Sequence, residues 1–227
     1  ARGRWLFCVD QDCQVPPEWV DRLARHLGEP GVGAAGGSIG VSNPENLSGW
    51  AVYFLEFLHH FPSQGYSRRT NSFLIGCNSA WVADLFGELA FPDQTLGEDV
   101  LLTHAVRRRG YTVVYDPRVT VCHRNREGWG EFLRYCRAMG RASAHYQLQL
   151  HPRWMWWMVH APLGVFAVPL VVLPCIGLRL LRAPAGYLPR FLLLLPVCVL
   201  GQIVWAVAFR KQLLAIASQV TKQSQEL

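Results

Sequence analysis

RWLFCVDQDC, residues 4–13, is the stretch from which the organisation of this chain is most easily worked out. Its apolar run, 5–9, is rich in aromatic and β-branched side chains, which is typical of a buried strand. The strand ends in two carboxylates, Asp10 and Asp12. Because an unpaired ionised carboxylate is costly to bury, a divalent cation is a natural partner, and oxygen ligands favour Mg²⁺ or Mn²⁺. A solvated turn in which the two aspartates cap the following helix is the alternative, and this stretch alone leaves both interpretations open.

Composition and charge limit the class of protein. The 227 residues suffice for one α/β domain and a smaller appendage. The net charge of +6 is dispersed apart from Arg68-Arg69 and the three arginines at 107–109. This pattern favours an anionic ligand or a membrane surface over nucleic acid. The seven cysteines include no C-x-x-C pair, so no disulfide or zinc framework is expected and a reducing compartment fits better.

Two segments without Asp, Glu, Lys or Arg, 154–178 and 191–209, predict two membrane-spanning helices. Each can cross a hydrocarbon layer of about 30 Å. Two buried core helices are the weaker alternative, since a domain of this size rarely hides two such segments. The short turn at 179–190 joins them into a hairpin. Seven basic residues flank the hairpin and three lie in its turn, so we expect both ends and the catalytic part on the cytoplasmic face of the membrane.

The spacing of apolar residues, together with the glycines and prolines that end each segment, predicts the other helices and strands. We expect helices at 16–29, 46–61, 83–89, 98–109 and 129–150, and strands at 32–41, 73–82 and 111–121. The helix at 129–150 is amphipathic and is expected to lie on the membrane surface ahead of the first span. Trp154, Trp156 and Trp157 fit an aromatic belt at the membrane interface.

Glu98 and Asp99 form a second candidate site. Both stand in the first turn of the helix expected at 98–109, where the helix dipole favours acids, so a structural role is open. Alternatively, one of them is a general base that takes a proton from a hydroxyl nucleophile. His123, which closes the strand after 111–121, is by itself more often a structural histidine than a ligand.

The order of these motifs resembles that of the family 2 glycosyltransferases. The motifs are DQD at 10–12, GCNSA at 76–80, GEDV at 97–100, RRGYTVVYDP at 108–117, and His123. The resemblance covers about two-thirds of the chain, 1–150. It implies a partial GT-A fold, which is a Rossmann-like mixed α/β sheet, and metal-assisted transfer of a sugar from a nucleotide diphosphate with inversion. A membrane hairpin after such a domain resembles members that act on lipid-linked or polysaccharide acceptors.

The resemblance implies metal-binding roles for three residues. Asp10 and Asp12 match the metal-binding Asp-x-Asp, with Asp12 the direct ligand and Asp10 also close to the donor substrate. His123 matches a histidine that joins the metal shell in some members. Imidazole suits Mn²⁺ better than Mg²⁺, and either ion is expected as the cofactor.

The resemblance also implies catalytic and substrate-binding roles. Asp99 matches the catalytic base, and Glu98 is its neighbour in the motif. Asn78 lies in a segment that borders the sugar pocket in relatives. We therefore expect Asp10, Asp12, Asp99 and His123 to meet around one cation at the carboxyl edge of the sheet.

The expected organisation has four parts: the C-terminal part of a GT-A domain (1–127), an interfacial helix (128–153), a transmembrane hairpin (154–209) and a cytoplasmic tail (210–227). The family's first strand–helix–strand units, which hold the base and ribose, are missing. The chain is thus expected to be a fragment that binds nucleotide poorly by itself. The Gln-x-x-Arg-Trp element of processive synthases does not follow His123, which favours transfer of a single sugar.

Two other functions remain open at this stage. One is a membrane-anchored binding module that keeps a degenerate GT-A fold without catalysis. The other is a metal-dependent phosphohydrolase that uses Asp10, Asp12 and His123. The expected partners of a transferase are a nucleotide-diphosphate sugar, a lipid-linked or glycan acceptor, and membrane lipid.

Overall fold

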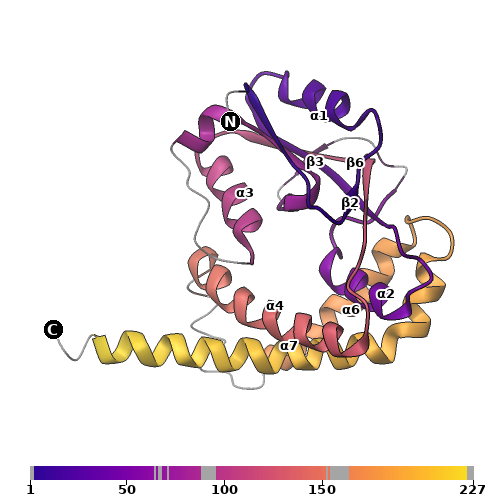
Figure 1. The fold of residues 1–227 in the computed structure, drawn as a ribbon. Helices are drawn as coiled ribbons and strands as arrows, with labels where there is room; N and C mark the ends of the chain where they lie inside the picture. The colour runs from indigo at the N-terminus through magenta and orange to yellow at the C-terminus, as the bar shows by residue number, and fades with distance from the viewer. Residues whose placement is uncertain are drawn as a thin grey trace.

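A mixed sheet stands at the centre of the computed structural model, which describes residues 3–63, 65, 68–70, 72–87, 96–151, 153 and 164–223 (Figure 1). Its strands are β1 (Trp5–Cys8), β2 (Cys13–Gln14), β3 (Val32–Val41), β4 (Arg68–Arg69), β5 (Ser79–Val82) and β6 (Thr112–His123). Five of the strands are ordered β1-β5-β3-β6-β2, and the sixth, β4, also pairs with β6. β1 and β3 are both antiparallel to β5, and β3 is parallel to β6. The carboxyl ends of β1, β3 and β6 therefore lie at the same edge of the sheet.

Helices cover both faces of this sheet. α1 (Trp19–Leu27) packs its apolar stripe on the face that includes Ala35 of β3. α3 (Glu98–Arg108) packs on the opposite face, which includes the adjacent Ala34. Successive side chains of a strand point to opposite faces, so β3 is buried on both sides. Figure 1 shows α1 above the sheet and α3 on its other side.

α2 (Leu47–Glu56) is a core helix at the edge where the parallel strands end. Asn46 caps it, because its side-chain oxygen accepts a hydrogen bond from the Gly49 amide at 2.8 Å. Tyr53 is fully buried and donates its hydroxyl proton to the Ile39 carbonyl of β3 at 2.6 Å. This bond fixes α2 against the sheet.

A bulge in β6 interrupts its pairing with β3. Gly37 pairs with Asp116, but the next residue of β3 pairs with Thr120, so residues 117–119 are extra. A Cβ atom at Gly37 would overlap the Val119 carbonyl oxygen, so glycine is required there. The bulge is the point at which β6 changes register before it reaches His123.

Residues 73–82 do not form one continuous strand as expected. Gly76–Asn78 is a short 3-10 helix, η1, and only β5 is extended. The next helix, η2 (Ala83–Gly87), is also of the 3-10 type. By contrast, β3 and the helix at 129–150 have the expected bounds.

The C-terminal helices form a layer below the sheet. They are α4 (Trp129–Leu150), η3 (Gly164–Ala167), α6 (Val168–Leu180) and α7 (Tyr187–Gln223). Figure 1 shows α4 running beside α7, on the side of the molecule away from α1. The two helices approach closely at Gly140, where a Cβ atom would clash with the Trp205 carbonyl oxygen. α4 is therefore packed against α7 along part of one face.

The end of α6 and the start of α7 lie against the α/β domain. Arg179 donates a hydrogen bond to the Leu58 carbonyl at 2.8 Å. The Arg190 guanidinium lies 5.0 Å from the ring centre of Trp50 in α2. The far end of a hairpin that crosses a bilayer twice would stand well away from these residues, so the expected two-span hairpin is not supported.

One membrane span, not two, has support among the described residues. Within α7, the 33 residues Tyr187–Gln219 are long and apolar enough to cross a membrane, as core helices of soluble proteins also can be. The apolar segment Gly164–Leu180 is shorter. The start of the first expected span and its three tryptophans, residues 154–163, lie outside the described residues.

Candidate active site

The DQD segment forms a tight turn after β1. The Cys13 amide donates to the Asp10 carbonyl at 3.1 Å and closes the turn. β2 then pairs antiparallel with the end of β6, so that Cys13 lies opposite His123. The Arg124 amide donates to the Asp12 carbonyl at 2.9 Å. These backbone bonds hold Asp12 beside His123, although the two residues are far apart in sequence.

Asp12, Cys13 and His123 form a cluster of potential metal ligands. His123 Nε2 lies 3.5 Å from Asp12 Oδ1, and the Cys13 sulfur lies 4.0 Å from that oxygen. One ligand atom from each of the three residues lies within 4.8 Å of the others. His123 is buried, whereas the Asp12 side chain is 45 % exposed. The cluster is thus enclosed by protein on the His123 side and open to solvent on the Asp12 side.

The second ring nitrogen of His123 is also held. Nδ1 lies 3.1 Å from Oδ1 of the buried Asn125. Asn125 is fixed by Asn43, which accepts from its amide at 3.0 Å and donates to its carbonyl at 2.9 Å. In its neutral form, His123 would donate from Nδ1 to Asn125 and keep a lone pair on Nε2. This is how proteins commonly orient a metal-binding histidine.

Asp10 lies beside this cluster and is not one of the three clustered ligands. Burial raises the pKa of Asp10, and the nearby Asp12 carboxylate raises it further, while His123 and Arg126 act in the opposite direction. Asp10 is therefore near enough to interact electrostatically with the cluster. The expected pair of aspartate ligands becomes one direct candidate, Asp12, with Asp10 adjacent.

Arg126 adds positive charge to the same region. Its guanidinium lies 4.8 Å from the ring centre of Tyr135 and pairs with Glu56 at 3.3 Å. Burial raises the pKa of Glu56 to about 7, and Arg126 partly opposes this. At neutral pH the positive charge of Arg126 is thus only partly neutralised by Glu56.

Asp99 sits at the start of α3 and is bound to η1. Its Oδ2 accepts a hydrogen bond from the Gly76 amide at 3.2 Å, and its Oδ1 accepts from the Val100 amide at 2.8 Å. Burial raises the pKa of Asp99 to about 6, with a further contribution from Glu98. Glu98 Oε2 is buried and has no hydrogen-bond partner among the residues described.

Asp99 and the Asp12 cluster are two parts of one region and do not share a single ligand cluster. They are connected through η1: Gly76 binds Asp99, and the next residue, Cys77, forms a thiol hydrogen bond with Cys13 that lowers the pKa of Cys13. The structure therefore brings Asp12 and His123 together, as expected, but the expected meeting of all four groups around one point is not observed.

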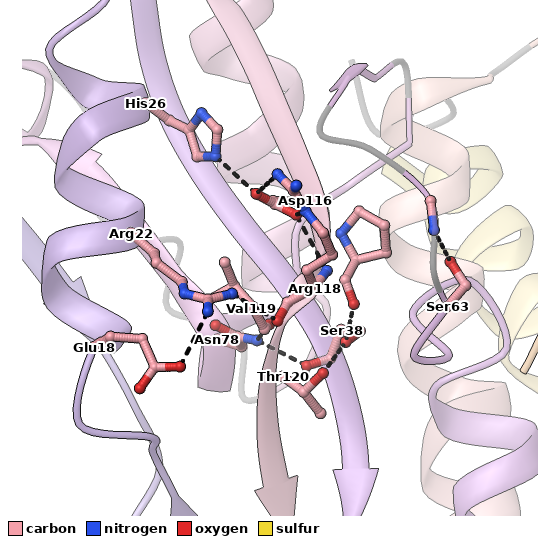
Figure 2. A network of polar contacts seen from close by, with 12 residues as sticks. Glu18, Arg22, His26, Ser38, Ser63, Asn78, Asp116, Arg118, Val119 and Thr120 are labelled. Atoms are coloured by element: carbon pink, nitrogen blue, oxygen red, sulfur yellow. Dashed lines mark hydrogen bonds and ion pairs between the residues drawn. The ribbon is translucent and has the colours of Figure 1, made fainter. Parts of the chain in front are cut away.

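Asn78 points into the protein interior. It is fully buried, and its amide nitrogen donates to the Ser38 and Val119 carbonyls, both at 2.8 Å. Its oxygen accepts from the Trp19 indole at 2.8 Å. These bonds join β3, the bulge of β6 and α1 around one side chain, and Figure 2 shows Asn78 beside Ser38 and Val119. The contacts give Asn78 a structural role and provide no support for its expected contact with a sugar.

Asp116 belongs to a polar network outside the Asp12 cluster, which Figure 2 shows together with Asn78. It is buried and accepts hydrogen bonds from the Arg118 side chain at 3.0 Å, and His26 lies 3.1 Å from it. Burial raises its pKa, but the hydrogen bonds from Arg118 and His26 prevail and lower it to about 2. The YDP segment of the sequence motif thus ties β6 to α1.

Three residues of the site were missed by the sequence reasoning: Cys13, Asn125 and Arg126. All three are next to, or within three residues of, a motif residue. The position of Asn125 two residues after His123 could have suggested it, because alternate residues in an extended segment share a face. Cys13 had no such signal, since its proximity to His123 depends on the pairing of β2 with β6.

This arrangement places the chain among the α/β proteins whose candidate ligand groups lie at the carboxyl ends of parallel strands. Residues 1–89 match the family model described as Glycosyl transferase family 2. The match includes the DQD turn and η1, and it confirms that the N-terminal part of the chain resembles that family. No curated protein matches the chain.

One matching solved structure is the mannosyltransferase PcManGT from Pyrobaculum calidifontis, in complex with GDP-Man and Mn²⁺. The sequence identity is 19 % and the TM-score is 0.46. The match covers 96 % of this chain and 62 % of that chain. The chain therefore spans less than two-thirds of the length of this relative.

Proposed function

We propose that this chain is part of a membrane-attached glycosyltransferase that moves one sugar from a nucleotide diphosphate to an acceptor hydroxyl, with inversion. The match of residues 1–89 to the family 2 glycosyltransferases supports the reaction class. The single observation that carries the proposal is the pairing of Asp12 with His123 at the carboxyl edge of the sheet, at 3.5 Å. A lipid-linked or glycan acceptor is part of the proposal.

The residues at this edge suit a divalent cation. A carboxylate oxygen and an imidazole nitrogen, with a thiol beside them, form a donor set acceptable to Mn²⁺. Asn125 supports this fit, since it leaves Nε2 of His123 available. Such an ion, when bound, would supply Lewis-acid stabilisation of charge on the departing diphosphate. Asp12 and His123 would hold it, with Asp10 close by.

Asp99 is the proposed general base. As the acceptor oxygen forms its bond to the anomeric carbon, its proton passes to Asp99, the bond from that carbon to the diphosphate oxygen breaks, and the nucleoside diphosphate leaves. A base with a pKa of about 6 is ionised at neutral pH and still basic enough to accept a proton. The backbone amides of Gly76 and Val100 would hold the carboxylate in position.

Arg126 is proposed to assist binding of the diphosphate. It carries charge of the required sign near Asp10. The nearby Glu56, with its pKa of about 7, neutralises that charge incompletely at neutral pH. Guanidinium groups bind phosphate oxygens well because their donors form a planar fork.

Membrane attachment is proposed to occur through α7, on the cytoplasmic face. The length and composition of Tyr187–Gln219 support this part of the proposal. Several large apolar side chains of α7 are exposed, including Leu193 at 67 % and Leu200 at 50 %. Exposed apolar side chains in such number are typical of a surface that meets lipid or a partner.

The test is transfer of labelled sugar by the intact protein, from a panel of nucleotide-diphosphate sugars, to membrane lipid and glycan acceptors. Asp99→Asn should lower the rate about a thousandfold, the usual range for loss of a general base. Asp84→Asn removes an exposed acid outside the site and serves as the matched control.

Three results would contradict the proposal. Full transfer activity in Asp99→Asn would show that Asp99 is not the general base. Phosphate release from simple esters without a sugar acceptor would indicate the phosphohydrolase instead. Donor binding without turnover by the intact wild-type protein, over the whole panel, would indicate a binding module.

A further inference from the structure

A groove between α4 and α7 has no role in the proposed transfer reaction. Its volume is about 580 Å³, which is in the usual range of sites for small amphipathic ligands. The groove is lined by Arg137 and Arg141 of α4 and by Ile203, Val204, Val207, Ala208, Lys211 and Gln212 of α7.

The charged side chains that line the groove are all cationic. Arg137 and Arg141 are one turn apart on α4 and therefore share a face, and Lys211 approaches from α7. No acidic residue lines the groove, and within the described part of the chain none of the three cations has a carboxylate partner. Two guanidinium forks and an ammonium group around one space favour a phosphate group.

Apart from Gln212, the rest of the groove is apolar and open. Ile203 is 44 % exposed and Val207 is 38 % exposed. Leu200, one turn earlier on the same face of α7, is 50 % exposed. An exposed apolar strip that leads directly to three cations fits a ligand with an anionic head and a hydrocarbon chain.

The position of the cations along α7 favours a lipid of the bilayer as that ligand. Lys211 comes two residues after the uncharged run 191–209. If the exposed face of α7 along that run lies against the hydrocarbon layer, Lys211 lies at the level of the lipid headgroups, where Lys and Arg side chains are stable. Ile203 and Val207 then lie at the level of the acyl chains.

We propose that the groove between α4 and α7 binds an anionic phospholipid. Its phosphate contacts Arg137, Arg141 and Lys211, and one acyl chain lies along Val207 and Ile203. Lipid binding at this groove does not depend on the proposed transfer reaction. A bound lipid would join the helix that follows the α/β domain to the helix that attaches the protein to the membrane.

The test is native mass spectrometry of the protein in detergent micelles, titrated separately with phosphatidylglycerol, phosphatidylcholine and glycerol 1-phosphate. Phosphatidylglycerol should bind at least tenfold more tightly than phosphatidylcholine, and glycerol phosphate should not bind measurably. Each cation near an anionic surface accounts for about fivefold in affinity. The triple variant Arg137→Gln, Arg141→Gln, Lys211→Gln should therefore lose phosphatidylglycerol binding by roughly a hundredfold.

The matched control removes three exposed arginines elsewhere. Arg25→Gln, Arg108→Gln and Arg109→Gln change the net charge equally, on α1 and at the end of α3, and should leave lipid affinity within about twofold, since salt screens distant charges. Val207→Ser should weaken binding of phosphatidylglycerol but not alter the preference over phosphatidylcholine.

Four outcomes would overturn the proposal. The first is equal binding of the two lipids, and the second is unchanged lipid affinity in the triple variant of Arg137, Arg141 and Lys211. The third is an equal loss of lipid affinity in the control variant of Arg25, Arg108 and Arg109. The fourth is binding of glycerol phosphate that is as tight as binding of the lipid. Equal binding of the two lipids would indicate that the groove does not select an anionic lipid and would favour an acidic protein partner instead. The assay reads bound lipid and not sugar transfer, so its failure and failure of the proposed reaction are separately visible.

Discussion

Asp99 shows how one buried carboxylate can be prepared for proton transfer. Burial and the neighbouring Glu98 raise its pKa to about 6, while backbone amides hold its oxygens. Protonated Asp99 cannot accept a proton, so the activity should require the ionised form.

We expect kcat/KM for transfer to rise about tenfold per pH unit below pH 6 and to level off above it. Glu98→Gln should move this rise to lower pH, because it removes a negative charge that raises the pKa of Asp99. A profile in Glu98→Gln that is unchanged or moved to higher pH would contradict the assignment. The measurement is the pH–rate profile of each protein.

His123 illustrates the importance of neighbours that do not themselves react. Replacement of Asn125 by Ala removes the acceptor for Nδ1 and should weaken Mn²⁺ binding by about tenfold to a hundredfold, as loss of such partners usually does. Asn125→Asp keeps an acceptor and should retain Mn²⁺ affinity. Gln14→Ala, at an exposed position on β2, is the control. Calorimetric titration with Mn²⁺, with circular dichroism to verify folding, distinguishes these cases.

At the scale of the element, the β6 bulge makes Asn78 a structural residue. Asn78→Ala would leave two carbonyls and the Trp19 indole without their partner. We expect a loss of about 3 kcal/mol in the free energy of unfolding, since each unsatisfied buried group costs about 1–3 kcal/mol. The measurement is urea unfolding of Asn78→Ala, with Gln11→Ala, at an exposed position, as the control. A changed KM for donor with unchanged stability would instead indicate substrate contact.

The same bulge carries the Asp116 network, whose effect on stability should depend on pH. Asp116 has its pKa lowered to about 2, below the unfolded value of 3.8. A depressed carboxylate stabilises the fold above the unfolded pKa, and this contribution is lost as pH falls from about 4 to about 2. It amounts to between about 2 and 3 kcal/mol, given about 1.4 kcal/mol per pKa unit.

Asp116→Asn should therefore lower the free energy of unfolding at pH 7 and flatten its fall below pH 4. Arg118→Gln should produce part of the same change, since His26 remains beside Asp116. Asp21→Asn, an exposed acid on α1, is the control. If the acid limb of the stability curve is the same in Asp116→Asn and in wild type, this explanation is wrong. Urea unfolding between pH 2 and pH 8 provides the data.

At the scale of the whole molecule, the C-terminal helices share the core of the α/β domain. Ile176 of α6 and Phe191 and Cys198 of α7 are buried in the same cluster as Trp50 and Phe54 of α2. The expected boundary at 153/154 therefore does not separate two independent cores.

A chain that ends at residue 153 should expose the apolar side of α2 and lose stability. We expect it to aggregate or to be digested by protease at least tenfold faster than the full chain, because large exposed apolar patches are unfavourable in water. Removal of residues 220–227 alone is the control. A stable, monomeric 1–153 chain would show that the shared cluster contributes little.

The parts of the fold that follow from local pattern were predictable. The apolar runs and the glycines at their ends predicted the bounds of β3 and α4 correctly, and the family resemblance predicted the proximity of Asp12 to His123. The role of Asn78 was not predictable, because a bulge depends on the register between distant strands. A second span has no support among the described residues, and counts of charge do not reveal that Arg179 donates a hydrogen bond to the Leu58 carbonyl.

Gly97, which precedes Glu98, is a position at which only glycine fits. Gly97 has φ +87°, and a Cβ atom there would lie 2.5 Å from Cδ1 of the Tyr146 ring on α4. Both the backbone conformation and the lack of space exclude a side chain. In a saturation library at position 97 that is screened for folded protein, we therefore expect to recover glycine alone.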